Sequence, residues 1–150
     1  MTAADDHCAN LVRAADKDRY LSALFAPDSR RTHLLALYAF DLEIRRIREA
    51  VSEPQLGLIR QQWWLDTVDS IYGGEVPAHP VAQGLSRAVE AGRLPKHALH
   101  NLVQAREFDL YADPMPDLAS LEGYLGETAA TLIQMAALVL AGTDAGRCAE

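Results

Sequence analysis

The chain has 150 residues, 49% of them hydrophobic and 23% charged, which fits one globular domain over residues 1–150. Its formal net charge of −7 disfavours general binding to nucleic acid, because that binding draws its affinity from contacts between cationic side chains and phosphates. The charge is unevenly spread: residues 107–150 hold eight acidic side chains and one basic one, so residues 1–106 are neutral overall. The neutral part contains a group of arginines, Arg30, Arg31, Arg45, Arg46, Arg48 and Arg60.

Features of the two ends favour an intracellular protein. Cys8 and Cys148 match no metal-ligand or redox spacing, which favours a reduced compartment. The acidic start, MTAADDHCAN, has neither the cationic nor the apolar segment of a secretory signal. The longest apolar run, Thr128 to Gly142, is shorter than the ~20 residues that span a bilayer, so we expect a buried helix. The short run favours a cytoplasmic protein that at most touches the inner membrane peripherally. Only two of the 14 basic residues are lysine, which favours a bacterial source.

The fold class follows from the spacing of apolar residues, which nowhere alternates with period two; we predict an all-α protein. A first helix is expected from about Asp6 to Phe25, since the residue before Pro27 avoids helical geometry. A second is expected from about Ser29 to Val51, with Asp28 or Ser29 as its cap. Its apolar residues recur at three- and four-residue steps and predict a buried stripe. The stripe consists of Leu37, Phe40, Ile44, Ile47 and Val51.

Four more helices are expected in the rest of the chain. They run from about Pro54 to the Gly73-Gly74 pair, from Pro80 to Ala91, and from Pro95 to Asp113. The last begins at a cap on Asp117 or Ser120 and ends at Gly142. This last helix is apolar nearly all round, and such a helix needs neighbours on every side. Either the five preceding helices surround it, or the fold is incomplete at its C-terminal end.

The second helix carries the most informative polar pattern. Asp41, Arg45 and Glu49 follow one another at four-residue spacing, so acid–base pairs worth about 0.2–0.5 kcal/mol each can form. One interpretation is an exposed, ion-paired edge. The other is a face that lines a cavity, where Arg45, Arg46 and Arg48 contact an anion or phosphate. The candidate cavity or anion contacts are Tyr38, Asp41 and Arg48.

Two other pairs have the spacing of metal ligands. Asp66 and Asp69 lie three residues apart and could share a divalent cation, although such cations bind more ligands than two carboxylates supply. An exposed acidic face is the favoured interpretation. His97 and His100 have the same spacing and lack any accompanying ligand pattern, so we interpret them as surface histidines. Two further acids four residues apart, Asp109 and Asp113, are also interpreted as exposed.

Four stretches, read in order, make the chain resemble the squalene/phytoene synthase family of all-helical prenyl synthases. The resemblance takes in most of the chain, from about Asp16 to Gly142, and depends on the order and spacing of the stretches together. It implies the helical bundle of the prenyl synthases. The stretches are Leu24-Phe-Ala-Pro-Asp-Ser-Arg-Arg31, Leu37-Tyr-Ala-Phe40, Trp64 to Gly74 with His79-Pro-Val-Ala82, and Glu122-Gly-Tyr-Leu-Gly-Glu-Thr-Ala129.

The resemblance also shows where this chain departs from active members. In those enzymes a DxxxD motif on the second helix binds Mg²⁺ ions that grip the substrate diphosphate. Here that stretch reads Arg45-Arg46-Ile47-Arg48-Glu49, so a cation stands at the first aspartate position and Glu49 at the closing one. An arginine repels Mg²⁺, and we therefore expect no metal cofactor.

Two further departures concern the start and the end of the chain. Active members carry a Ser- and Lys-containing diphosphate contact where this chain has Lys17-Asp-Arg-Tyr20. Their second aspartate-rich motif follows the helix that corresponds to Thr128–Gly142, and residues 143–150 contain no such motif. The chain therefore resembles the N-terminal half to two-thirds of the family fold.

The runs Val51–Trp64 and Thr67–Tyr72 look most like a non-catalytic branch of the family, that of complex I assembly factor 6. This resemblance implies a pseudoenzyme that helps to assemble a membrane respiratory complex, with subunits of that complex or a prenyl or lipid tail as partners. The alternative is an active head-to-head prenyl diphosphate synthase, a Mg²⁺-dependent transferase acting through Glu43, Asp66 or Asp69. A third possibility is a helical interaction domain without a cavity.

Overall fold

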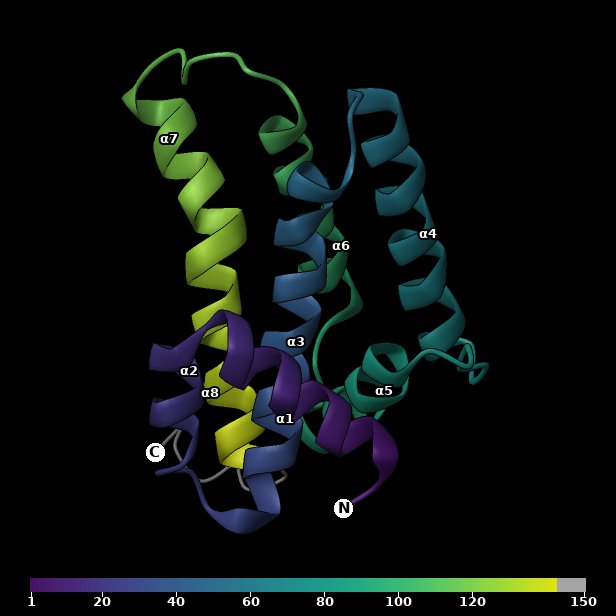
Figure 1. Cartoon of the computed structure of the whole chain (residues 1–150). Coiled ribbons are helices and arrows are strands. Elements are labelled where there is room, and N and C mark those ends of the chain that lie inside the picture. The colour runs from purple at the N-terminus through teal and green to yellow at the C-terminus, as the bar shows by residue number, and fades with distance from the viewer. Residues whose placement is uncertain (143–150) are drawn as a thin grey trace.

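The computed structural model describes residues 1–142, and every regular element in that range is a helix, which confirms the predicted all-α class (Figure 1). The elements are α1 (Ala3–Ala15), α2 (Lys17–Ala23), α3 (Asp28–Ala50), α4 (Pro54–Tyr72), α5 (Pro80–Gly92), α6 (Lys96–Ala105), the 3₁₀ helix η1 (Arg106–Leu110), α7 (Leu118–Leu125), the π-helical turn η2 (Gly126–Ala130) and α8 (Thr131–Ala141).

Helix α3 is the centre of the bundle and contacts α1, α2, α4, α5, η1 and α8 (Figure 1). The predicted stripe is confirmed at four positions, because Leu37, Phe40, Ile44 and Ile47 are buried. Val51 lies just beyond the helix end and is half-buried. Each fully buried side chain of this size contributes about 1.5–3 kcal/mol through removal from water. The stripe therefore fixes which face of α3 turns toward its neighbours.

The predicted single helix from Asp6 to Phe25 is wrong, because the chain breaks at Asp16. This residue leaves helical geometry, with φ −145° and ψ 78°. Its carboxylate accepts a hydrogen bond from the backbone N–H of Arg19 at 3.2 Å and so caps α2. An N-cap carboxylate satisfies one of the amide groups that a helix start leaves without a partner. The break turns the side chains of Asp16 and Arg19 toward α3.

Other boundaries were predicted with mixed success. Helix α3 is preceded by Pro27 and has no side-chain cap, so the expected capping role of Asp28 or Ser29 is wrong. Helix α6 ends at Ala105 and tightens into η1, well before the predicted end at Asp113. The cap of the last helix is confirmed: the Asp117 carboxylate accepts from the Ser120 N–H at 2.7 Å.

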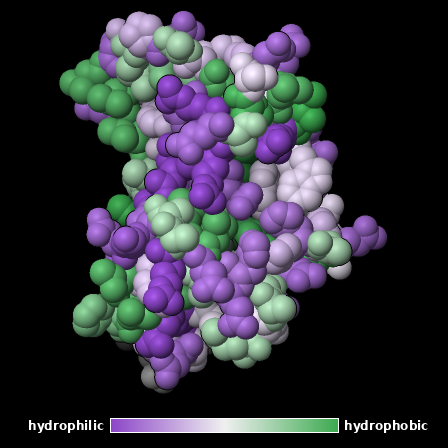
Figure 2. Space-filling model, in the orientation of Figure 1, coloured by the Kyte–Doolittle hydropathy of each residue, from purple (hydrophilic) through white to green (hydrophobic). Residues whose placement is uncertain are grey.

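The C-terminal stretch Leu118–Ala141 is continuously helical and has a buried face and an exposed one. Leu132, Met135 and Val139 are buried in the bundle, where α8 contacts α3 and α5. The alternative in which the five preceding helices surround this helix is therefore wrong for the opposite face. Figure 2 shows hydrophobic residues gathered over α7. The exposed apolar side chains of this stretch are Leu118, Leu121, Leu125, Ile133 and Leu140.

Within residues 1–142, this stretch is also the one helix long and apolar enough to cross a membrane by length and composition. Of the 18-residue apolar segment that has this character, 33% is buried inside the bundle. Helices in the cores of globular proteins can have the same length and composition as membrane spans. Because one face of α8 packs against α3 and α5, we assign α8 to the helical core.

Gly84 allows α1, α3 and α5 to approach one another closely. A Cβ at this position would lie 3.0 Å from both Ala36 Cβ and Cys8 Sγ. Because overpacking of a dense core costs about 1–3 kcal/mol, Gly84→Val is expected to lower the free energy of unfolding by about 2 kcal/mol in urea denaturation. The same change at Gly123, where a Cβ meets nothing within 4 Å, is the control and should shift stability little. Equal effects at the two positions would contradict close packing around Gly84.

Cys8 is fully buried beside this contact, and burial raises the pKa of its thiol to about 11. A thiol with that pKa is protonated near pH 7 and reacts slowly, since the thiolate is the nucleophile. We expect iodoacetamide to modify Cys8 in the unfolded chain far faster than in the folded one, as measured by peptide mass spectrometry. Rapid modification of the folded protein would contradict this burial. Cys148 lies outside the described residues.

Candidate functional site

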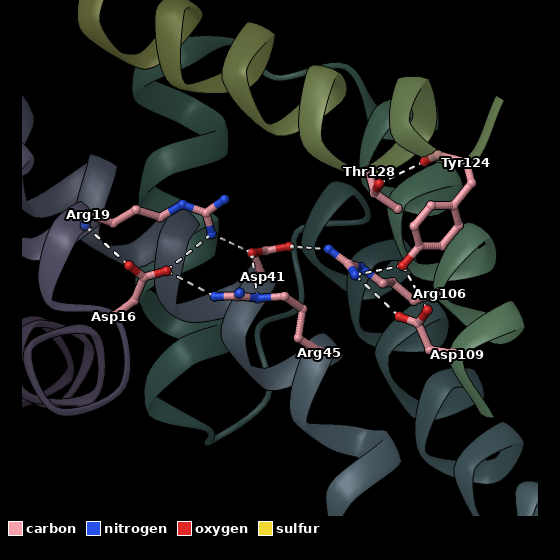
Figure 3. A network of polar contacts seen from close by, with 8 residues as sticks. All are labelled: Asp16, Arg19, Asp41, Arg45, Arg106, Asp109, Tyr124 and Thr128. Atoms are coloured by element: carbon pink, nitrogen blue, oxygen red, sulfur yellow. Dashed lines mark hydrogen bonds and ion pairs between the residues drawn. The ribbon is translucent and has the colours of Figure 1, made fainter. Parts of the chain in front are cut away.

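Helix α3 places one carboxylate in the interior of the bundle. The side chain of Asp41 is 1% exposed. Arg19 Nη1 donates a hydrogen bond to Asp41 Oδ2 at 2.8 Å, and Arg45 Nε lies 3.0 Å from the same oxygen. Arg106 Nη2 lies 3.9 Å from the other oxygen, Oδ1. Three guanidinium groups, from α2, α3 and η1, thus surround one buried carboxylate (Figure 3).

A second carboxylate, Asp16, lies on the α1–α2 side of this group. Its Oδ2 accepts a hydrogen bond from Arg45 Nη2 at 3.1 Å and lies 3.5 Å from Arg19 Nη1. The guanidinium of Arg19 also lies over the ring of Tyr38, 5.4 Å from its centre, in a cation–π contact. Burial raises the pKa of Tyr38 above its usual value, although Arg19 opposes the shift. The break between α1 and α2 is therefore what brings these charges to α3.

A third set of contacts comes from residues of η1 and α7. In a 3₁₀ helix, residues three apart lie on the same side, so Arg106 and Asp109 face together. Arg106 Nη1 donates to Asp109 Oδ2 at 3.2 Å and to the Tyr124 hydroxyl at 2.8 Å. That hydroxyl donates to Asp109 Oδ1 at 2.7 Å. Thr128 in turn donates to the backbone carbonyl of Tyr124 at 2.7 Å, which ties η2 to the group (Figure 3).

We call this group the Asp41 network; its members are Asp16, Arg19, Asp41, Arg45, Arg106, Asp109 and Tyr124. Its three guanidinium groups balance its three carboxylates, so it has no spare charge of either sign. Within residues 1–142, three of its buried atoms form no hydrogen bond: Arg106 Nε, together with Arg45 Nε and Asp41 Oδ1, which take part in ion pairs only. Chemically, the arrangement can join α1–α2, α3, η1 and α7, and can hydrogen-bond one small polar group at its centre.

Loss of the Tyr124 hydroxyl tests the contacts that Tyr124 forms with Arg106 and Asp109. Burial, together with the hydrogen bond to Asp109, raises the pKa of Tyr124, so its hydroxyl is protonated and can donate at pH 7. Tyr124→Phe removes two hydrogen bonds to charged groups and is expected to lower the free energy of unfolding by about 2 kcal/mol. Urea denaturation measures this loss. Tyr111→Phe, at a side chain that is 41% exposed, is the control and should have little effect; an equal loss there would contradict the role given to Tyr124.

The arginines predicted as anion contacts diverge in the structure. Arg45 belongs to the Asp41 network, whereas Arg46 lines a cleft between α3 and α4, and Arg48 is exposed. The ion pair between Asp41 and Arg45 forms, but Glu49 is exposed and pairs with no other residue within 1–142. The exposed-edge interpretation is therefore wrong for Asp41, which is buried. Arg48 is exposed and does not line the cleft of Arg46, and its role as an anion contact stays a prediction.

The predicted metal pairs are engaged elsewhere. Asp66 is exposed and accepts a hydrogen bond from Gln62 at 2.8 Å. Asp69 lies 2.6 Å from Lys96 Nζ and 3.0 Å from His100 Nε2, and the bond with Lys96 lowers the pKa of Asp69. Among residues 1–142, no group of three His, Cys, Asp or Glu side chains is arranged to hold a metal ion. His97 and Asp113 are exposed, as predicted, whereas His100 is half-buried.

Several members of the Asp41 network are not predicted as site residues from the sequence. The interpretation of Asp109 as exposed is wrong, since its side chain is 22% exposed and bonded to Arg106 and Tyr124. Asp16 carries a usable signal, because an aspartate within a predicted helix can mark a break and a new N-cap. No local signal identifies Arg106 or Tyr124 as members of the network, because Arg106 reaches Asp41, and Tyr124 reaches Arg106, only through tertiary packing.

An apolar cleft of about 370 Å³ adjoins the network between η1 and α7. The ring of Tyr124 belongs to both, and Phe108 packs near it with ring centres 5.9 Å apart. Met115, Pro116 and Gly123 complete the apolar wall. The molecule therefore places an apolar groove directly beside a neutral, ion-paired polar group.

Sequence comparisons relate the chain to known proteins. The sequence profile of the squalene/phytoene synthase family matches residues 12–150, which confirms the predicted resemblance. The chain is 35% identical to the bovine (Bos taurus) NADH dehydrogenase (ubiquinone) complex I, assembly factor 6, over 93% of its own length and 42% of the relative's. The human (Homo sapiens) protein of that name is 34% identical over the same shares, and the Drosophila melanogaster homolog is 31% identical over 85% and 40%.

The structural comparison identifies the fold. A dehydrosqualene synthase crystallised with a ligand superposes with a TM-score of 0.79 at 17% identity. The match takes in 91% of this chain and 47% of the synthase. The chain thus spans less than half the length of these relatives.

Proposed function

The chain belongs to the squalene/phytoene synthase family, and on that premise we propose that it is a non-catalytic member that serves as an assembly factor for a respiratory complex. The observation that carries this proposal is the charge balance of the Asp41 network. A prenyl synthase site needs spare carboxylates to hold metal ions and spare positive charge to hold a diphosphate. Here each carboxylate of the network already pairs with a guanidinium of the same protein.

The residues at this site do not fit Mg²⁺. The sequence resemblance predicts that Arg45 stands at the position of the first aspartate in the family's motif. Its guanidinium lies within 3.1 Å of oxygens of both Asp41 and Asp16. A cation introduced there would meet the charge of Arg45 and would have to displace Arg19 as well. Glu49, at the closing position of the motif, is exposed on α3. No step of a reaction is therefore assigned to a metal.

The kind of partner protein is proposed from the names of the relatives that the chain resembles. The bovine and human relatives are named as assembly factors of NADH dehydrogenase (ubiquinone) complex I, and 93% of this chain matches each of them. We therefore propose subunits of a complex I–type NADH dehydrogenase as partners, on the cytoplasmic face of a bacterial inner membrane.

A ligand role for the groove beside Tyr124 is part of the same proposal. Its walls are apolar, and its volume of about 370 Å³ lies in the range of small-molecule sites. A prenyl or lipid tail fits this chemistry, with the polar end near the unpartnered atoms of the network. Such binding needs no bond-breaking chemistry from the protein.

Deletion of the gene in its native host tests the assembly role. Native gels of the membranes should show less assembled NADH dehydrogenase complex, and the NADH oxidation activity of the same membranes should fall with it. A plasmid copy of the full-length gene should restore both. Normal amounts of the assembled complex in the deletion strain would contradict the proposed role.

A further inference from the structure

A second cleft lies on the side of α3 that faces away from the Asp41 network. Helical geometry, at about 100° per residue, places Glu43, Ile47 and Ala50 roughly opposite Asp41 and Arg45. These three residues, together with Arg46, form one wall, and residues of α4 form the other. The cleft has a volume of about 330 Å³, and nothing in the proposed assembly role uses it.

The aromatic wall of this cleft is held in place by edge-to-face contacts. Trp63 and Trp64 have ring centres 4.8 Å apart at 82°, and the ring of His79 lies 5.3 Å from Trp64. Phe40 supports Trp64 from the core at 5.4 Å. Trp64 is buried, whereas Trp63 is 43% exposed and presents a large apolar surface to the cleft. A fixed wall of this kind suits the apolar part of a ligand.

Two arginines on different helices give the cleft its charge. Arg46 of α3 and Arg60 of α4 both line it, and neither forms an ion pair or a side-chain hydrogen bond with another of residues 1–142. Glu43 is the one acidic lining residue, so the two arginines leave a net positive charge. The His79 Nδ1 atom is buried and has no hydrogen-bond partner in the described part of the chain. The cleft thus offers free guanidinium donors beside apolar surface.

We propose that the cleft between α3 and α4 binds an anionic amphiphile, a phosphate monoester on an apolar chain. Guanidinium groups match the oxygens of a phosphate in shape and charge, and they bind it with strong charge-assisted hydrogen bonds. The chain of the ligand covers Ala50 and Trp63, which a free phosphate leaves exposed to water. The ligand is either a soluble alkyl phosphate or the headgroup of a membrane lipid, since both present the same chemistry.

Tryptophan fluorescence offers a direct test, because the sequence contains two tryptophans and both line this cleft. The probe is dodecyl phosphate, kept below its micelle concentration, with inorganic phosphate and dodecyltrimethylammonium as comparison ligands. We expect a saturable change in emission with dodecyl phosphate, and binding that is at least about tenfold weaker for both comparison ligands. Equal binding of the cationic surfactant would overturn the proposal.

Variants then locate the site. The double variant Arg46→Gln/Arg60→Gln is expected to weaken the binding of dodecyl phosphate by about tenfold or more. Arg48→Gln is the matched control, because Arg48 is exposed on the same helix and does not line the cleft; it should bind like the parent protein. Circular dichroism should show unchanged helix content in both variants. Unchanged binding by the folded double variant would overturn the proposal.

Vesicle sedimentation identifies the source of the ligand. Phosphatidylcholine vesicles containing phosphatidic acid should bind the parent protein, and not the double variant, if the ligand is a membrane lipid. Binding of dodecyl phosphate without vesicle binding supports a soluble ligand in the same cleft. Equal vesicle binding by the parent protein and the double variant would contradict a lipid site at Arg46 and Arg60.

Discussion

Replacing Asp41 with alanine is expected to lower the free energy of unfolding by about 3 kcal/mol, the lower end of the usual cost of breaking a buried ion pair. The change leaves Arg19, Arg45 and Arg106 facing a space that no longer holds a carboxylate. The cost is at the lower end because Arg19 and Arg45 are 31% and 33% exposed and can turn partly toward water. Urea denaturation at pH 7 measures the effect.

Glu49→Gln is the matched control for this experiment. Glu49 is on the same helix, is exposed and pairs with no other residue within 1–142, so we expect a change below about 0.5 kcal/mol. A loss of less than about 1 kcal/mol in Asp41→Ala would mean that the network does not hold the helices together. A similar loss in both variants would show that α3 is sensitive to any lost carboxylate.

The second large effect concerns Arg45, which the sequence resemblance predicts to stand where family enzymes carry an aspartate. Arg45→Asp removes the ion pairs with Asp16 and Asp41 and places a third carboxylate beside them. In a chelating buffer this variant should be less stable than the parent protein by about 2–4 kcal/mol, because like charges then meet in a partly buried site. Three neighbouring carboxylates also form an oxygen-rich cation site.

Magnesium should therefore affect the variant and the parent protein differently. Millimolar Mg²⁺ is expected to restore about 1 kcal/mol of stability to Arg45→Asp and to leave the melting temperature of the parent protein unchanged. Arg46→Asp is the control: this side chain is exposed and outside the network, so the variant should lose little stability and gain nothing from Mg²⁺. Stabilisation of the parent protein by Mg²⁺ would contradict the view that Arg45 takes the place of the metal.

Much of the fold was predictable because local rules decide it. The period of the apolar residues predicts α3, and the prolines at the starts of α4 and α5 mark where those helices begin. The break at Asp16 was not predictable from propensity alone, because the carboxylate that ends α1 is held by Arg45, 29 residues away. Tertiary contacts override a local helical preference there.

The candidate site was predictable only in part. The four-residue spacing of Asp41 and Arg45 predicts their ion pair, which forms on α3. Spacing cannot tell a buried face from an exposed one when both carry charges, and so the sequence leaves the exposed edge and the cavity face open as alternatives for Asp41. Arg106 and Tyr124 come from later segments: the packing of η1 against α3 brings Arg106 to Asp41, and Tyr124 of α7 joins through its bond with Arg106.

The C-terminal helix illustrates the same limit. Its composition predicts burial on all sides, whereas the exposed leucines of α7 and α8 lie on an open face. The prediction that the fold is incomplete at its C-terminal end stays a prediction. We propose that helices outside residues 1–142, corresponding to the remainder of the synthase fold, cover this face. A full-length protein in which the helix around Leu121 and Ile133 is protected from amide hydrogen exchange would agree with this, and an exposed helix there would contradict it.

If the Asp41 network replaces the metal and diphosphate site of a prenyl synthase, the protein should not ionise a prenyl diphosphate. The decisive assay is the release of diphosphate by the full-length protein from farnesyl or geranylgeranyl diphosphate in the presence of Mg²⁺, with an active synthase of the family as positive control. We predict a rate equal to that without protein and no condensed triterpene or tetraterpene product. Mg²⁺-dependent release that Asp66→Asn abolishes, or the appearance of such a product, would contradict this replacement.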